Sequence, residues 1–157
     1  MARYSSSTTV AVSKTRGELE ALLKNRGAEG FGYAWKGRDC VVSFQLNGRL
    51  ILYRIPMPDR ADVRFTHSPA GRCRKLDSAH AAWEQSERQI WRALLLVVRA
   101  KIEAVEAGIS TIEQEFLAWT SLPNGSTVHE WLEPQIATLG RDGKLPKLIA
   151  APRSSDG

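Results

Sequence analysis

The pair Asn47-Gly48 stands between two runs of β-forming residues, CVVSFQL (40–46) and RLILYRI (49–55). Asn and Gly tolerate the positive φ that a type I′ turn needs at both central positions, so this is the strongest short-range hairpin signal in the chain. A two-residue turn also fixes the register of the two strands. We therefore predict four facing pairs: Leu46 with Arg49, Phe44 with Ile51, Val42 with Tyr53 and Cys40 with Ile55.

The two faces of this hairpin differ in polarity. The four predicted pairs share one side, which we interpret as core, with Cys40 inside it. The other side is neither fully apolar nor fully polar, so another element, a second subunit or a ligand could cover half of it. Its residues are Val41, Ser43, Gln45, Leu50, Leu52 and Arg54.

Further strands are predicted on the N-terminal side of the hairpin. The aromatic-rich stretch FGYAW (31–35) predicts a third strand, and residues 8–12 could add a fourth at the edge. The prolines of IPMPDR (55–60) end the sheet, because proline cannot extend a central strand. In ordinary strand alternation Phe31, Tyr33 and Trp35 share one face. We interpret that face as core, the alternative being exposed rings that stack on nucleic-acid bases.

Helical periodicity predicts four helices around the sheet. A first helix runs from a cap at Ser13 to Gly27, and the longest runs from Asp77 or Ser78 to Gly108. Its centre, ALLLVV (93–98), is apolar all round, which predicts burial on more than one side. Two shorter helices complete the set. Ser110 and Glu113 form a capping box for one that ends at Trp119, and the other covers 127–139 and is broken up from Gly140.

These elements predict the α+β class, because the strands and the helices form separate runs. The expected architecture is an antiparallel meander of three or four strands packed against a long central helix. An N-terminal helix and two short C-terminal helices flank it. At 157 residues the chain suits one domain. We place that domain at 1–140 and a flexible C-terminal tail at 141–157.

The charge of the chain is unevenly distributed. The formal net charge is +5, but residues 1–76 carry 14 Lys or Arg against 6 acids, whereas residues 77–133 carry 4 against 9. Such a polar molecule could place one face on a phosphate backbone. It could equally pack its two halves together, or pack neighbouring subunits head to tail. The basic stretch RADVRFTHSPAGRCRK (60–75) lies in a loop punctuated by Gly and Pro, between the strands and the longest helix.

This basic loop is the strongest candidate for a binding surface. Phosphate binding needs several cations on one surface, and single-strand binders add aromatic rings that stack on bases. We predict that Phe65 is the stacking ring. The predicted nucleic-acid-binding residues are Arg60, Arg64, Phe65, Arg72, Arg74 and Lys75, with Lys36 and Arg38 added from the strand turn. The alternative is a solvated connection whose arginines pair with the acidic C-terminal half.

Catalytic and metal chemistry find little support in the sequence. The histidines His67, His80 and His129 are scattered, and the spacing of Cys73 and His80 fits no zinc site. No hydrolase, metalloprotease or phosphate-loop motif occurs. We therefore predict no catalytic residue, no metal and no cofactor. The two cysteines read as free thiols, and neither a membrane span nor a signal peptide is recognisable, so we expect a cytoplasmic protein.

Four blocks of the chain carry a resemblance to known proteins. FGYAW, RIPMPDR, the stretch from Glu87 to Trp119 and LPNGSTVHEWLEPQI together resemble a family of small, uncharacterised proteins of tailed bacteriophages and prophages, over roughly residues 10–140. The order of helix, meander, basic connection and long helix is similar to that of phage single-strand annealing proteins. That likeness implies rings or filaments that hold single-stranded DNA in a basic groove.

These observations give two expectations for function. The first is a phage-encoded, non-enzymatic protein that binds and anneals single-stranded DNA in recombination or replication, as a homo-oligomer in the host cytoplasm. The second is a protein–protein interaction module, such as an inhibitor of a host or defence factor or an assembly component. In that case its charge asymmetry would steer docking to a partner protein.

Overall fold

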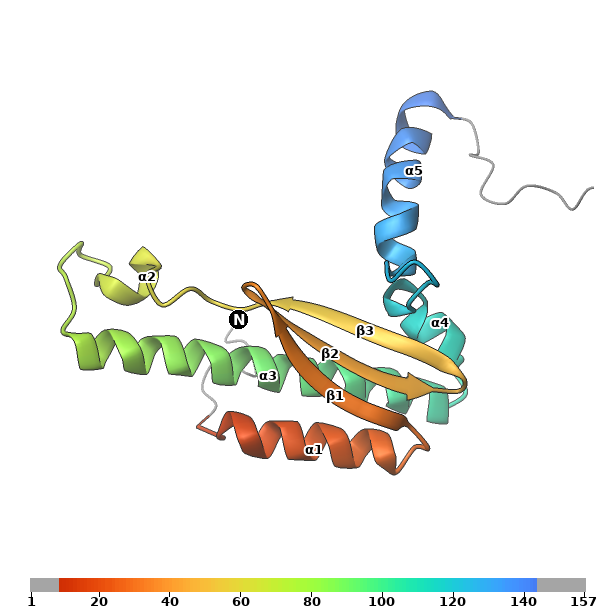
Figure 1. The fold of residues 1–157 in the computed structure, drawn as a ribbon, viewed down its shortest axis with the longest axis horizontal. Helices are drawn as coiled ribbons and strands as arrows, with labels where there is room; N and C mark the ends of the chain where they lie inside the picture. The colour runs from red at the N-terminus through yellow and green to blue at the C-terminus, as the bar shows by residue number, and fades with distance from the viewer. Residues whose placement is uncertain (1–8, 144–157) are drawn as a thin grey trace, which may run out of the picture.

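The computed structural model describes residues 9–143 (Figure 1). The predicted α+β class, with a meander and a long helix, is confirmed. In chain order the elements are α1 (Val12–Lys24), β1 (Glu29–Lys36), β2 (Asp39–Leu46), β3 (Arg49–Pro56), α2 (Val63–Thr66), α3 (Leu76–Glu106), α4 (Ile112–Phe116), the short 3-10 helix η1 (Leu117–Trp119) and α5 (Val128–Asp142).

The sheet has the order β1-β2-β3, and all four predicted pairs of the hairpin are confirmed. Asn47 and Gly48 have φ values of 52° and 72°, as a type I′ turn requires. The predicted core face is buried, including Cys40. The predicted fourth strand is wrong for the residues that the structure describes, because the chain enters α1 at Val12. Thr8 lies outside those residues.

Two helices cover one face of the sheet. Figure 1 shows α3 running behind the strands with α1 beside it, and their apolar side chains form one cluster with the inner face of the sheet. Trp91, Leu95 and Val98 of α3 are fully buried in this cluster. Val97 on the outer side of α3 is exposed, so the ALLLVV segment is buried on fewer sides than its composition predicts.

Three predicted helix ends are wrong by a few residues. Ser13 does not cap α1, because the Thr15 N–H bonds to the carbonyl of Ala11 one residue before the helix. The capping box of α4 uses Thr111 and Gln114, since the Ser110 hydroxyl donates instead to the Glu115 carboxylate at 2.6 Å. The last helix passes through Gly140 and ends at Asp142, because the left-handed residue that terminates it is Gly143 (φ 63°).

The C-terminal helix stands away from the rest of the molecule. In Figure 1 α5 projects from the α4–η1 end of the body, and its closest packing is against η1. None of its described side chains is buried. The predicted flexible tail falls, from residue 144 on, outside the described residues. Within residues 9–143 no helix has both the length and the apolar character needed to cross a membrane.

Candidate nucleic-acid interface

The basic connection is an ordered structure rather than the predicted loop. After β3 the chain runs beyond the end of the sheet and along the first half of α3 (Figure 1). The Asp62 carboxylate caps α2 by accepting from the Arg64 N–H at 2.9 Å. His67 and Cys73 then pair as a β-bridge, and Gly71 turns the chain between them with φ +76°. We call residues 67–75 the basic hairpin.

Phe65 does not lie in an exposed loop, so the prediction that it stacks on bases is wrong. Its side chain is only 6% exposed, and it is the buried residue of α2, which packs against α3. The Arg64 guanidinium lies 4.7 Å from the centre of the ring. Phe65 therefore lies beneath the basic surface and holds α2 against α3 by packing. A helix of one turn leaves no periodicity in the sequence, which is why this burial could not be foreseen.

Two tryptophans supply the aromatic surface instead. Both border a hollow of about 230 Å³ between the β1–β2 turn, the end of β3 and α3, which we call the Trp cleft. Two side chains of opposite charge, Asp59 and Arg60, line it from the connection. Its full lining is Trp35, Arg38, Met57, Pro58, Asp59, Arg60, Trp83 and Glu87.

Trp83 is held firmly and carries a cation on its face. Its indole N–H donates to the carbonyl of Pro58 at 2.8 Å, and the Arg60 guanidinium lies 4.0 Å above the ring centre. A second hollow of about 330 Å³ shares Arg60 and Trp83 and is lined also by Thr66 and His80. The Arg60–Trp83 pair therefore borders both hollows, and the second one includes Thr66, the residue before the basic hairpin.

Trp35 is open to solvent although it lies on the inner face of the sheet. It pairs with buried Cys40, yet it is 53% exposed, because it lies near the end of the edge strand and borders the open Trp cleft. Tyr33 is 47% exposed, but its ring makes an edge contact with buried Trp91 at 6.0 Å between centroids, and Phe31 packs against the core. The core interpretation is thus wrong for Trp35 and only partly right for Tyr33. One feature of the sequence could have indicated that Trp35 is exposed: it lies one residue before Lys36, next to a turn.

The predicted cations differ in whether they are neutralised. Arg38 pairs with Asp59 at 2.8 Å and Arg64 with Asp62 at 3.2 Å, so these partners are local and do not come from the acidic C-terminal half. The other five have no carboxylate within ion-pair distance among residues 9–143. They are Lys36, Arg60, Arg72, Arg74 and Lys75.

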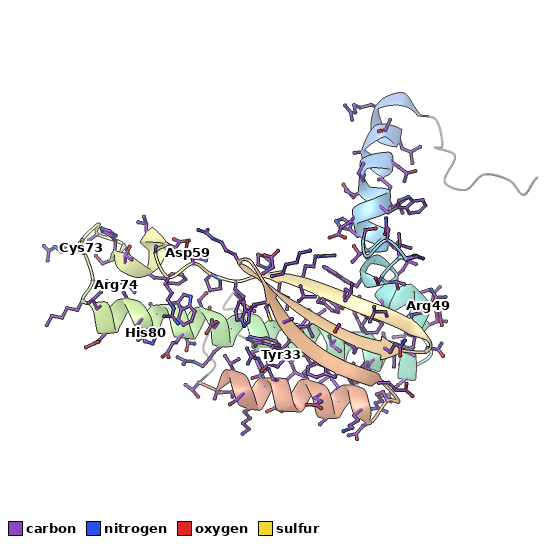
Figure 2. All side chains as sticks on the ribbon, viewed as in Figure 1. Tyr33, Arg49, Asp59, Cys73, Arg74 and His80 are labelled. Atoms are coloured by element: carbon purple, nitrogen blue, oxygen red, sulfur yellow. The ribbon has the colours of Figure 1, made fainter. Side chains whose placement is uncertain are left out.

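The structure brings most of the predicted cations to one end of the molecule. Arg38 and Arg60 lie at the Trp cleft, with Lys36 next to it on the turn. Figure 2 shows Arg74 at the far tip of the connection and Asp59 between that tip and the sheet. Stretches 35–38 and 57–80 together carry seven Lys or Arg against three Asp, so this end is basic on balance. Arg49, a basic residue of the hairpin turn, lies at the opposite end.

One acidic side chain inside the cleft has a perturbed titration. Burial raises the pKa of Glu87, while the nearby guanidinium groups of Arg16 and Arg60 act to lower it. The effect of burial is larger than the effect of the two guanidinium groups, so the cleft disfavours the charged form of the Glu87 carboxyl.

Other parts of the molecule show weaker features of a binding site than the basic end does. A hollow of about 570 Å³ lies along α3 between Leu96 and Ile109, and its lining is mostly alkyl. Within residues 9–143, no three His, Cys, Asp or Glu side chains come close enough together to hold a metal ion.

Comparison of the chain with protein families, with curated proteins and with solved structures finds no match.

Proposed function

We propose that this protein binds single-stranded nucleic acid, DNA in the first place, at the basic end formed by the Trp cleft and the basic hairpin. The observation that carries the proposal is the exposed Trp35 beside Trp83 with its stacked Arg60, next to cations that have no carboxylate partner. The phage context and a role in annealing during recombination or replication are part of this proposal, as is a cytoplasmic location.

A single strand fits this surface better than a duplex. Trp35 presents ring surface, and a flat ring can stack only on a base whose face is free. In a duplex those faces are covered by neighbouring base pairs. Base–aromatic stacking contributes about 1–3 kcal/mol per base and tolerates any sequence. The cleft and the hairpin therefore combine a sequence-tolerant stacking contact with an electrostatic one.

The basic hairpin supplies the electrostatic part. Arg72, Arg74 and Lys75 lie beyond the cleft, on a backbone that is held by the His67–Cys73 bridge. Each phosphate that such a cation neutralises releases condensed counterions, so affinity falls steeply with salt. Because the hairpin is ordered, these side chains are held near their binding positions, and less backbone entropy is lost on binding.

The direct test is fluorescence anisotropy of labelled single-stranded and duplex oligonucleotides over a salt series, with nuclease-treated protein. We expect tighter binding of the single strand. The triple variant Arg72→Ala, Arg74→Ala, Lys75→Ala should lose at least about tenfold in affinity, and its salt slope should fall by about 2, since each phosphate of a single strand contributes roughly 0.7.

A charge-matched triple variant controls for the loss of net charge. Lys24, Arg99 and Arg141 are exposed on α1, α3 and α5, and their replacement by Ala removes the same charge. We expect this control to keep the native salt slope. Equal losses in both triple variants would mean that only net charge matters, and the assignment of the basic end would then be wrong.

A second candidate function is interaction with a protein, including a second copy of this chain. The observation that favours it is an apolar groove of about 410 Å³ between η1 and α5, bordered by Leu117, Leu132 and Ile136. Leu117 and Ile136 are each 48% exposed. Pull-down from host lysate after nuclease treatment separates the two candidates, because a partner that nuclease removes was held by nucleic acid.

A further inference from the structure

The basic hairpin contains a cysteine and a histidine in direct contact. The thiol Sγ of Cys73 lies 3.2 Å from the Nε2 of His67, across the β-bridge that closes the hairpin. Cys73 is exposed to solvent. A nucleophile and a base within hydrogen-bond distance, with the base held by a third group, is the arrangement that activates thiols in proteins.

The third group is Thr66, whose hydroxyl holds the imidazole from the Nδ1 side. The Thr66 hydroxyl donates to the carbonyl of Asp62 at 3.3 Å, so its oxygen is free to accept. It lies 2.9 Å from the Nδ1 of His67. With the hydroxyl hydrogen on the Asp62 carbonyl, the Thr66 oxygen accepts from Nδ1–H, and in that tautomer Nε2 is the nitrogen that accepts the proton of the Cys73 thiol.

The surroundings of the thiol are cationic. Arg72 and Arg74 flank Cys73 in the chain, and neither has a carboxylate partner among residues 9–143. Figure 2 shows Cys73 and Arg74 together at the tip of the connection, away from the body of the protein. Positive charge around an accessible sulfur attracts anionic reagents.

We propose that Cys73 is a base-assisted nucleophilic thiol that reacts with small anionic disulfides. The Cys73 proton moves to Nε2 of His67, and the thiolate attacks one sulfur of the disulfide. A bond forms between Sγ and that sulfur while the bond between the two reagent sulfurs breaks. The leaving thiolate takes the proton back from His67, so one disulfide and one thiol give a mixed disulfide and a new thiol. This step does not depend on nucleic-acid binding.

The other cysteine provides an internal reference. Cys40 is fully buried, and burial raises the pKa of its thiol, with Arg16 and Glu87 as smaller influences of opposite sign. It should react only when the chain unfolds. Any fast reaction of the native protein therefore belongs to Cys73, and Cys73→Ser should abolish it.

The experiment measures release of nitrothiobenzoate from the dianionic disulfide dithiobis(nitrobenzoate) at neutral pH. We expect the native protein to react about ten times faster than its own thiols react in concentrated urea, corrected for the effect of urea on a free thiol. An unassisted thiol is only a few per cent ionised at neutral pH, and only the thiolate reacts. A base that removes the proton can therefore raise the reaction rate about tenfold. A native rate equal to or below the unfolded one would overturn the proposal.

Variants then separate the base from the cations. His67→Gln should slow the reaction about tenfold with both the dianionic reagent and the neutral dithiodipyridine, and Thr66→Val should slow it less. Arg72→Gln with Arg74→Gln should slow only the reaction with the dianionic reagent. If His67→Gln keeps the native rate, or if the arginine variant slows both reagents equally, the corresponding role is refuted.

Discussion

At the residue scale, Glu87 shows how the Trp cleft places an acid where charge is disfavoured. Burial raises the pKa of its carboxyl in the folded protein, against smaller lowering effects of Arg16 and Arg60. A raised pKa means that the folded chain binds this proton more tightly than the unfolded chain does. The contribution to stability is therefore present at acid pH and is lost as the pH rises through the folded-state pKa.

Glu87→Gln removes this ionisation and should raise the melting temperature at about pH 7 by roughly 1–3 °C. The advantage should disappear as the pH falls to about 4, where the native side chain is protonated as well. Thermal denaturation followed by circular dichroism at several pH values measures the melting-temperature difference at about pH 7 and its loss at low pH. Glu103→Gln, exposed further along α3 and outside the groups that act on Glu87, is the control and should show no such pH dependence. A constant difference between Glu87→Gln and native protein at every pH would contradict the argument.

Single residues also show which properties a sequence pattern predicts and which it does not. Strand alternation correctly placed Trp35 on the inner face, because side-chain direction follows from the period of the strand alone. Whether that face is covered depends on how far α1 and α3 extend, which is a tertiary property. Alternation therefore gave the direction of Trp35 but not its exposure, and the same limit hid the stacking of Arg60 on Trp83.

At the element scale, the segment 57–75 behaves as a small unit built on the first half of α3. Phe65 anchors α2 there, and the basic hairpin follows directly from α2 through the bond from the Arg74 N–H to the Thr66 carbonyl at 2.7 Å. The geometry of both the cations and the Cys73–His67 pair thus depends on one buried ring. Phe65 acts on the surface through packing rather than through contact with a ligand.

Phe65→Ala should destabilise the protein by on the order of 3 kcal/mol, as expected for removal of a buried aromatic ring. Hydrogen exchange should accelerate across 60–82 and remain slow across 91–102, where the core of α3 is buried. Val63→Ala is the control, because Val63 belongs to the same turn and is 68% exposed. It should change stability by less than about 0.5 kcal/mol. Native exchange rates in Phe65→Ala would show that the ring is not the anchor.

Elements with strong local signals were predictable, and those held by distant contacts were not. The β2–β3 hairpin was predicted to the residue because a two-residue turn leaves one register. The basic hairpin instead depends on bonds between residues up to eight apart, such as Arg74 to Thr66, which no periodic pattern records. Its composition of Gly, Pro and Arg matched an irregular loop equally well.

At the scale of the whole molecule, two different surfaces lie at opposite ends of α3. The basic end holds the Trp cleft and the basic hairpin, while the other end holds α4, η1 and the projecting α5 (Figure 1). That second end carries Glu113, Glu115, Glu130 and Glu133, so it accounts for much of the negative charge of residues 77–133. If the groove between η1 and α5 joins two copies, the basic end of each copy stays open.

If two copies associate through this groove, self-association and nucleic-acid binding can be removed independently. Ile136→Glu places a charge in the apolar groove and should then convert the associated protein to the 17.4 kDa monomer in sedimentation velocity, while the salt slope of DNA binding stays native. Ala137→Glu, exposed and one residue further on, adds the same charge outside the groove and should sediment like the native protein. The triple variant at 72, 74 and 75 should show the opposite result, with native sedimentation and a reduced slope. Loss of both properties in Ile136→Glu alone would mean that binding requires the oligomer and that the two ends act as one surface.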